Sequence, residues 1–192
     1  GTVETNTLSV VFDQAVGDLP IATRTGYTIK GWNSKADGSG TAYTKDTLYQ
    51  VPSNLTLFAQ WENNTYTLTY DYQGADGGNT ETEKSVTFNS AYGALPTPEK
   101  TGYTFESWYS ALSGGTNIVT TTTVSTASNH TIYAKWIANT YTLTYDYQGA
   151  DGGNTETEKS VTFNSAYGAL PAPEKTGYTF DNWYSALSGG TK

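Results

Sequence analysis

Acidic side chains gather in one segment of the sequence, DYQGADGGNTETE, at residues 71–83. The carboxylates of Asp71, Asp76, Glu81 and Glu83 are hard oxygen ligands, the kind that Ca²⁺ prefers in proteins. Their spacing does not follow the D-x-D-x-D-G order of a calcium loop, and the dense ligand set of such a loop is missing. The segment is therefore predicted to be a polar hairpin loop.

The residues needed for other site chemistry are scarce. The chain has one histidine, His130, and no cysteine, so neither a zinc site nor a serine–histidine–aspartate relay can be assembled. The glycine pairs at 77–78 and 114–115 are not followed by the Gly-Lys-Ser/Thr of a phosphate loop and are interpreted as turns. His130 is predicted to be a solvated loop residue. We expect no catalytic residue, no metal, no cofactor and no enzymatic activity.

Tyrosine is the residue type that could carry a binding function, and the chain has sixteen. Tyr92, Tyr109 and Tyr133 lie beside expected turns or opposite the expected core face. Exposed tyrosines are rigid and amphipathic, which suits contacts with protein or glycan. The alternative is that these rings pack between neighbouring strands or neighbouring repeats. The three residues are candidate ligand contacts under the first interpretation.

Composition narrows the class of protein. The net charge is −8 with only ten Lys and Arg, which makes a phosphate-tracking basic surface and nucleic-acid binding unexpected. No apolar run approaches the roughly 18 residues of a membrane-spanning helix, and the absence of methionine indicates a fragment of a longer chain. Many threonines and tyrosines with twenty glycines favour short strands and turns. We expect a mainly β fold, with helix content low or absent, in a secreted or surface-exposed protein.

The sequence repeats itself in tandem. The segment that begins at Thr65 returns at Thr140, and residues 65–117 differ from 140–192 at only four positions. A more diverged copy precedes them, in which Trp61 corresponds to Trp136. Internal repetition of this kind indicates tandem small modules, here of about 75 residues each. The predicted units are an incomplete repeat at 1–62 that lacks its first strand, a complete repeat at 63–137, and an incomplete repeat at 138–192 that lacks its last strand.

Each complete unit is predicted to contain four main strands. Alternating residues in YTLTYDY (66–72) and TIYAKW (131–136) give the period of two expected for strands with one buried face. A second strand is predicted at SVTF (85–88), a short extra one near 122–124, and irregular connection in between. The remaining main strand is the aromatic segment GYTFESW, which also occurs as GYTIKGW and GYTFDNW. These three copies start at residues 102, 26 and 177.

The aromatic segment breaks the alternation of a regular strand. Tyr103 and Phe105 share a face, but Trp108 follows Phe105 by three positions and would point the other way. A bulge near Ser107 and its counterparts in the other two copies, or a sheet covered on both faces, would reconcile the pattern. The counterparts are Gly31 and Asn182.

The motif as a whole resembles the Listeria/Bacteroides repeat, the B-repeat of internalin B. A strand ending in Asp-Tyr-x-Gly precedes Pro-x-Pro-x-Lys-x-Gly-Tyr-Thr-Phe-x-x-Trp-Tyr, and the unit closes on Leu/Ile-Tyr/Phe-Ala-x-Trp. The matching positions include the structural motif residues Gly102, Tyr103, Phe105, Trp108 and Trp136. The resemblance implies a β-grasp-like (ubiquitin-like) module, strung in tandem in bacterial surface or secreted proteins, with no catalytic residues to transfer.

Two functions fit such repeats. Near-identical copies joined by short linkers suit a stalk or spacer that projects a distal binding domain from a cell surface. The alternative is a multivalent adhesive module that binds host-cell or envelope protein or glycan through exposed tyrosines and the variable segments 33–54 and 110–130. The incomplete repeats would leave sheet edges open, so head-to-tail self-association is a further expectation.

Overall fold

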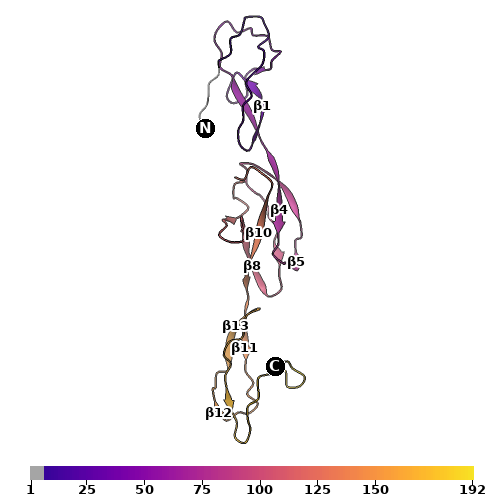
Figure 1. The fold of residues 1–192 in the computed structure, drawn as a ribbon, viewed down its shortest axis with the longest axis vertical. Coiled ribbons are helices and arrows are strands. Elements are labelled where there is room, and N and C mark those ends of the chain that lie inside the picture. The colour runs from indigo at the N-terminus through magenta and orange to yellow at the C-terminus, as the bar shows by residue number, and fades with distance from the viewer. Residues whose placement is uncertain (1–6) are drawn as a thin grey trace. The chain divides into compact units, whose positions relative to one another are not determined.

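The computed structural model describes residues 7–192, and in that range it contains strands, turns and loops but no helix. The mainly β prediction is confirmed. Figure 1 shows the strands in chain order, from indigo at the N-terminal end to yellow at the C-terminal end. The chain divides into two compact units. The first draws on Gly1–Gln73, Thr80–Pro96 and Ser107–Ala134, and the second on Gly74–Asn79, Thr97–Glu106 and Lys135–Lys192.

The first copy forms a three-stranded antiparallel sheet in the order β2-β1-β3. Its strands are β1 (Tyr27–Asn33), β2 (Ala42–Tyr43) and β3 (Phe58–Asn63). The register shifts between Ile29 and Gly31, which lie opposite Trp61 and Gln60. Gly31 has a φ of 150°, a conformation that only glycine adopts readily. The bulge predicted before the tryptophan is therefore confirmed in this copy.

The second copy forms a five-stranded sheet in the order β6-β4-β10-β8-β9. Its strands are β4 (Thr65–Asp71), β6 (Glu83–Thr87), β8 (Tyr103–Tyr109), β9 (Asn117–Ile118) and β10 (His130–Ala138). The β4–β6 and β8–β9 pairs are antiparallel, whereas β4 and β10 are parallel. Leu68 and Tyr70 of β4 and Ile132 and Ala134 of β10 are buried. The alternation read from the sequence therefore identified the core faces of both central strands.

A pair of two-residue strands was missed by the sequence prediction. β5 (Gly77–Gly78) pairs with β7 (Pro98–Glu99), and the third copy repeats the arrangement with β12 (Gly152–Gly153) and β14 (Pro173–Glu174). Two glycines carry no hydrophobic alternation, so only turn chemistry was visible. Gly78 has a φ of 80°, and a Cβ there would lie 2.7 Å from the carbonyl oxygen of Thr97. The close approach of the two strands thus requires glycine.

The third copy retains only part of the sheet. β11 (Thr140–Thr144) and β13 (Glu158–Thr162) form an antiparallel pair, but residues 177–184 form no strand. The strand predicted at GYTFDNW is wrong for this copy. In the second copy the equivalent strand, β8, lies beside β10; Lys192 aligns with Asn117, so the 192-residue chain holds no counterpart of β10 for the third copy.

The short strand predicted near residues 122–124 is reduced to one isolated bridge between Ala91 and Thr123. The segment nevertheless contributes to the core, because Val124 is fully buried.

Candidate functional site

Tyr92 lies in the core of the second copy, which agrees with the packing interpretation and not with the ligand-contact interpretation. Only 6% of its surface is accessible, and burial raises the pKa of its hydroxyl. The first copy has Val16 at the equivalent position, also buried, and the backbone N–H groups of Val16 and Tyr92 donate to matching carbonyls of Thr47 and Thr122 at 2.9 Å. Both copies therefore bury the side chain at this position, and Tyr92 offers a ligand little surface.

His130 is the polar partner of Tyr92 rather than a solvated loop residue. It begins β10, and its Nδ1 lies 2.9 Å from the carbonyl oxygen of Ser128, which can only accept. Nδ1 therefore donates to that carbonyl, and in the neutral imidazole Nε2 accepts a hydrogen bond from the Tyr92 hydroxyl at 2.7 Å. Lys84 donates from Nζ to the Tyr92 carbonyl oxygen at 2.6 Å. Both contacts hold the loop after β6 against the sheet.

The other two candidate contact residues, Tyr109 and Tyr133, are half-buried on the neighbouring strands β8 and β10. Tyr133 pairs with Asp71 in the β4–β10 ladder, and Tyr109 pairs with Asn117 in the β8–β9 ladder. Each side chain retains accessible surface on a strand that packing holds in place. The structure thus places Tyr109 and Tyr133 on one sheet. Both are more exposed than Tyr92 and remain candidate ligand contacts.

Trp108 is the centre of an aromatic cluster. It is 2% exposed, and its ring centroid lies 5.2 Å from that of Tyr70 and 5.3 Å from that of Tyr72. Its Nε1 donates to the carbonyl oxygen of Pro96 at 2.9 Å, which ties the proline-rich connection to the sheet. Burial, then the charge of Glu81 and the neighbouring Tyr72, raises the pKa of Tyr70 to about 12. The Tyr70 hydroxyl is buried without a hydrogen-bond partner.

The motif residues Phe105 and Trp136 pack together, with ring centroids 5.5 Å apart. Nζ of Lys100 lies 4.8 Å from the ring centroid of Tyr103 and 5.8 Å from that of Trp136. These distances are within the range of cation–π attraction. This cluster lies at the end of β10, next to the residues that connect the second copy to the third.

Gly102 and Tyr103 form a joint with the third copy. The ring of Phe163 packs edge-on against Tyr103 with centroids 5.4 Å apart, and a Cβ on Gly102 would lie 2.4 Å from that ring. Asn139 links the two sides. Its N–H donates to the Gly102 carbonyl at 2.9 Å, its carbonyl accepts from the Phe163 N–H at 2.8 Å, and its Oδ1 accepts from Thr104 Oγ1 at 2.7 Å.

The joint between the first and second copies has the same construction. Phe88 packs edge-on against Tyr27 at 5.5 Å, and a Cβ on Gly26 would lie 2.3 Å from the Phe88 ring. Asn64 makes the corresponding bonds to Gly26, Phe88 and Thr28 at 2.9, 2.9 and 2.6 Å. Sequence analysis missed this role of the asparagines. The signal was available, since Asn64 and Asn139 occupy the same position in successive repeats, each within a short linker.

The acidic segment stabilises turns. The Asp76 carboxylate accepts hydrogen bonds from the Thr101 N–H at 2.9 and 3.1 Å. Hydrogen bonding from the side chain and then the backbone of Thr101 holds the pKa of Asp76 below its ordinary value. Asp71 accepts from the Gln73 N–H at 3.0 Å. These contacts secure the loop between β4 and β6, as the prediction of a polar hairpin loop indicated.

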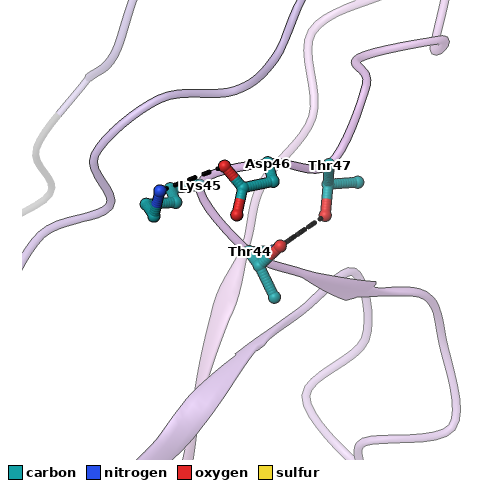
Figure 2. A network of polar contacts seen from close by, with 4 residues as sticks. All are labelled: Thr44, Lys45, Asp46 and Thr47. Carbon is teal, nitrogen blue, oxygen red and sulfur yellow. Dashed lines mark hydrogen bonds and ion pairs between the residues drawn. The ribbon is translucent and has the colours of Figure 1, made fainter.

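The variable segments share a turn despite their different sequences. Figure 2 shows the turn of the first copy, where Thr47 Oγ1 lies 3.2 Å from Thr44 Oγ1 and Lys45 pairs with Asp46 at 3.1 Å. Thr47 Oγ1 also accepts from the Thr44 N–H at 2.9 Å. In the second copy the N–H of Val119 donates to Thr122 Oγ1 at the same distance. In both copies the turn is therefore closed by a threonine that lies three residues after the N–H donor. The exposed Lys45–Asp46 pair belongs to the first copy alone.

Within residues 7–192, no three His, Asp or Glu side chains are grouped as metal ligands. The same residues contain no helix long and apolar enough to cross a membrane. Among the features that recur, the aromatic cluster and the joint contain the motif residues Gly102, Tyr103 and Trp108.

The pattern of repeats matches known proteins. The profile of the Listeria-Bacteroides repeat domain matches residues 1–60, 66–135 and 141–192. A protein named putative Gly-rich membrane protein from Evansella cellulosilytica is 31% identical over 183 residues, 94% of this chain and 20% of its own length. Internalin H of Listeria monocytogenes is 38% identical over 127 residues, 66% of this chain and 21% of its own length.

A second Evansella cellulosilytica protein, named putative membrane protein, is 32% identical over 132 residues, 68% of this chain and 18% of its own length. The chain thus spans about a fifth of the length of these relatives. Three tandem matches cover nearly all of its residues, and the chain belongs to the Listeria-Bacteroides repeat family.

Proposed function

We propose that the chain is a non-catalytic stalk that spaces a distal binding domain away from a bacterial surface. The repeated joint carries this proposal. Asn64 and Asn139 make the same three hydrogen bonds, and the bond to the glycine carbonyl is 2.9 Å long in both joints. A linker held this way adds length in defined increments, whereas a flexible tether would need no such contacts.

The relatives support a location at the cell surface. One is named an internalin and two are named putative membrane proteins. We propose that this chain is likewise extracellular, attached to the bacterial surface or secreted, as part of a longer protein. A cysteine-free and methionine-free sequence is suited to an oxidising exterior.

We further propose that each complete repeat, residues 63–137 in this chain, is a β-grasp-like module, flanked by incomplete repeats at 1–62 and 138–192. Support comes from the order of the five-stranded sheet, in which the first and last strands of the copy, β4 and β10, are central and parallel. In this arrangement the irregular segment 88–97 takes the place of a crossover helix between β6 and β8. Tyr92 and Trp108 anchor it to the sheet.

Small-angle scattering tests the spacer. Proteins with one, two and four copies of residues 63–137 should increase in maximum dimension linearly with copy number. Gly102→Ala at every joint should lower the maximum dimension and broaden the distribution of interatomic distances. The added Cβ would displace the phenylalanine ring of the next copy, which is Phe163 in this chain. A maximum dimension that grows as the square root of copy number would contradict the proposal, since that is the behaviour of a flexible chain.

Adhesion is the second candidate, and exposed apolar residues in the second copy favour it. Leu112 and Val119 of the variable segment are 67% and 45% exposed, and Tyr109 and Tyr133 retain accessible surface. A multivalent module would bind host cells or envelope glycans weakly as one copy and strongly as four. Binding that is absent at every copy number would exclude this candidate and leave the spacer.

Head-to-tail self-association is a further proposal, which rests on strands that lie at the edges of two sheets. β3 is the edge of the sheet β2-β1-β3, and β11 pairs only with β13 in its two-stranded sheet. We propose that these edges pair between molecules at high concentration. Light scattering that reports only monomer up to about millimolar protein would contradict this, because edge pairing of weak affinity should be populated there.

A further inference from the structure

The two central strands of the second copy are also the strands through which the chain enters and leaves it. The copy begins with β4 at Thr65 and ends with β10 at Ala138. The strands are adjacent and parallel, with partners from His130 opposite Leu68 to Tyr133 opposite Asp71. Tension along the chain therefore pulls β4 toward its start and β10 toward its end, in opposite directions along one shared axis.

We infer that the β4–β10 pair is a mechanical clamp, which gives the module the function of carrying tension. This inference deepens the spacer proposal and rests on it for its biological use. In the shear direction, the ladder bonds between paired residues carry load together and must fail together. If the same strands were pulled apart from one end, the bonds would fail one after another, at lower force.

The clamp is shielded from water, which competes for hydrogen bonds when a ladder is strained. Leu68 and Ile132, one from each strand, are 0% and 1% exposed. Each covers the ladder on the core side. The side chain of Asn129 adds one more link at the start of β10, where its Oδ1 accepts from the N–H of Thr67 at 2.9 Å.

The joints deliver load to the ends of the clamp. Asn64 precedes β4 by one residue, and Asn139 follows β10 by one residue. Each asparagine is bonded to both sides of its joint. Tension passing through the linkers thus reaches the first residue of β4 and the last residue of β10 rather than a loop.

The experiment is force spectroscopy on the full chain with chosen attachment points, which the absence of cysteine makes simple. Thr65→Cys with Thr140→Cys loads the ladder in shear. Thr65→Cys with Ser128→Cys attaches at the starting ends of both strands and peels them apart. All three side chains are exposed, so urea unfolding of both double variants should match the parent chain and establish that the fold is intact.

We expect a severalfold higher rupture force in shear than in peeling. The released contour lengths identify the event. Each is the extended length between the handles, about 27 nm for the roughly 75 residues between the shear handles and about 23 nm for the roughly 63 between the peeling handles, minus the distance between the handles in the folded chain. Equal forces, or a higher force in peeling, would overturn the clamp. Either result leaves the scattering test of the spacer unaffected, because the increase of maximum dimension with copy number does not depend on the rupture force.

Discussion

The second and third copies have nearly the same sequence over residues 65–117 and 140–192 but different structures. In the second copy, β4 spans seven residues and GYTFESW forms β8. In the third, β11 spans five residues and GYTFDNW forms no strand. Tyr178, the counterpart of Tyr103, is 74% exposed. The presence of β10 in one copy and not the other explains the shorter strand and the segment that forms no strand. The exposure of Tyr178 has a different cause, because Tyr103 is covered by the Phe163 ring of the following copy.

The aromatic cluster survives where the strand does not. Trp183 lies 5.1 and 5.4 Å from the rings of Tyr145 and Tyr147, and its Nε1 donates to the carbonyl oxygen of Pro171 at 2.8 Å. The corresponding distances around Trp108 are 5.2, 5.3 and 2.9 Å. Local sequence therefore determines the cluster, and the neighbouring strand determines whether the segment extends and the core closes.

Replacing the two equivalent tryptophans should give the largest difference in stability between the second and third copies. Trp108→Ala removes a buried ring and leaves the Pro96 carbonyl without its donor, so we expect a loss of about 3–5 kcal/mol in the free energy of unfolding. Trp183 is only half-buried, so Trp183→Ala should cost about 1–2 kcal/mol. Urea unfolding of the full chain, followed by far-ultraviolet circular dichroism, measures both.

Phenylalanine at each position is the matched control, because it retains most of the apolar area and loses the indole donor. Trp108→Phe should recover more than half of the loss. Equal costs for the two alanine variants would show that the third copy is as closed in solution as the second.

Two equivalent glycines, Gly102 and Gly177, allow the packing at the joint to be tested separately from backbone strain. Gly102 and Gly177 both have φ near 80°, so alanine at either position costs about 1–2 kcal/mol in backbone strain. Only Gly102 lies against a ring, that of Phe163; at Gly177 an added Cβ would meet nothing within 4 Å. Gly102→Ala should therefore cost about 1–3 kcal/mol more, the typical penalty of overpacking.

Thermal unfolding of the two alanine variants gives the difference directly. Phe163→Leu combined with Gly102→Ala should narrow it, because the smaller side chain leaves room for the methyl group. A difference of zero would mean that the ring moves aside without cost and that the joint does not depend on its packing.

Sequence reasoning predicted what periodicity encodes. The alternation of residues in 66–72 and 131–136 placed Leu68 and Ile132 in the core. The tryptophan that falls out of phase with this alternation in the aromatic segment predicted the bulge seen at Gly31. It failed where the outcome depends on contacts distant in sequence. The strand at 177–183 needed a neighbour, and the β5–β7 pair depends on glycines that carry no pattern. For Tyr92, its place beside a turn did not decide between ligand contact and packing.

The candidate site was predicted in part for the same reason. The motif residues Gly102 and Tyr103 were found because they recur, but their contact with the next repeat needed three-dimensional information. The role of Asn64 and Asn139 was missed, because their recurrence in successive linkers does not by itself distinguish a hydrogen-bonded asparagine from a solvated one.

Tyr70 and its counterpart Tyr145 offer a smaller test in which the two copies should agree. Both hydroxyls are buried without a hydrogen-bond partner, and an unsatisfied buried hydroxyl is destabilising. Tyr70→Phe should raise the free energy of unfolding by about 1 kcal/mol, and Tyr145→Phe should change it in the same direction. A loss of stability in Tyr70→Phe would mean that the hydroxyl has a partner in solution.

Alkaline pH distinguishes the hydroxyl from the ring. Because the pKa of Tyr70 rises from 10.0 to about 12 on folding, the folded state favours the protonated form. That contribution to stability is complete below pH 10 and is lost as the pH rises toward 12. The parent chain should therefore lose stability more steeply than Tyr70→Phe in urea titrations between about pH 10 and pH 12. If the free energies of unfolding of the two proteins fell in parallel with pH, the Tyr70 hydroxyl would be in contact with water. The edge of the aromatic cluster around Trp108 would then be solvated as well.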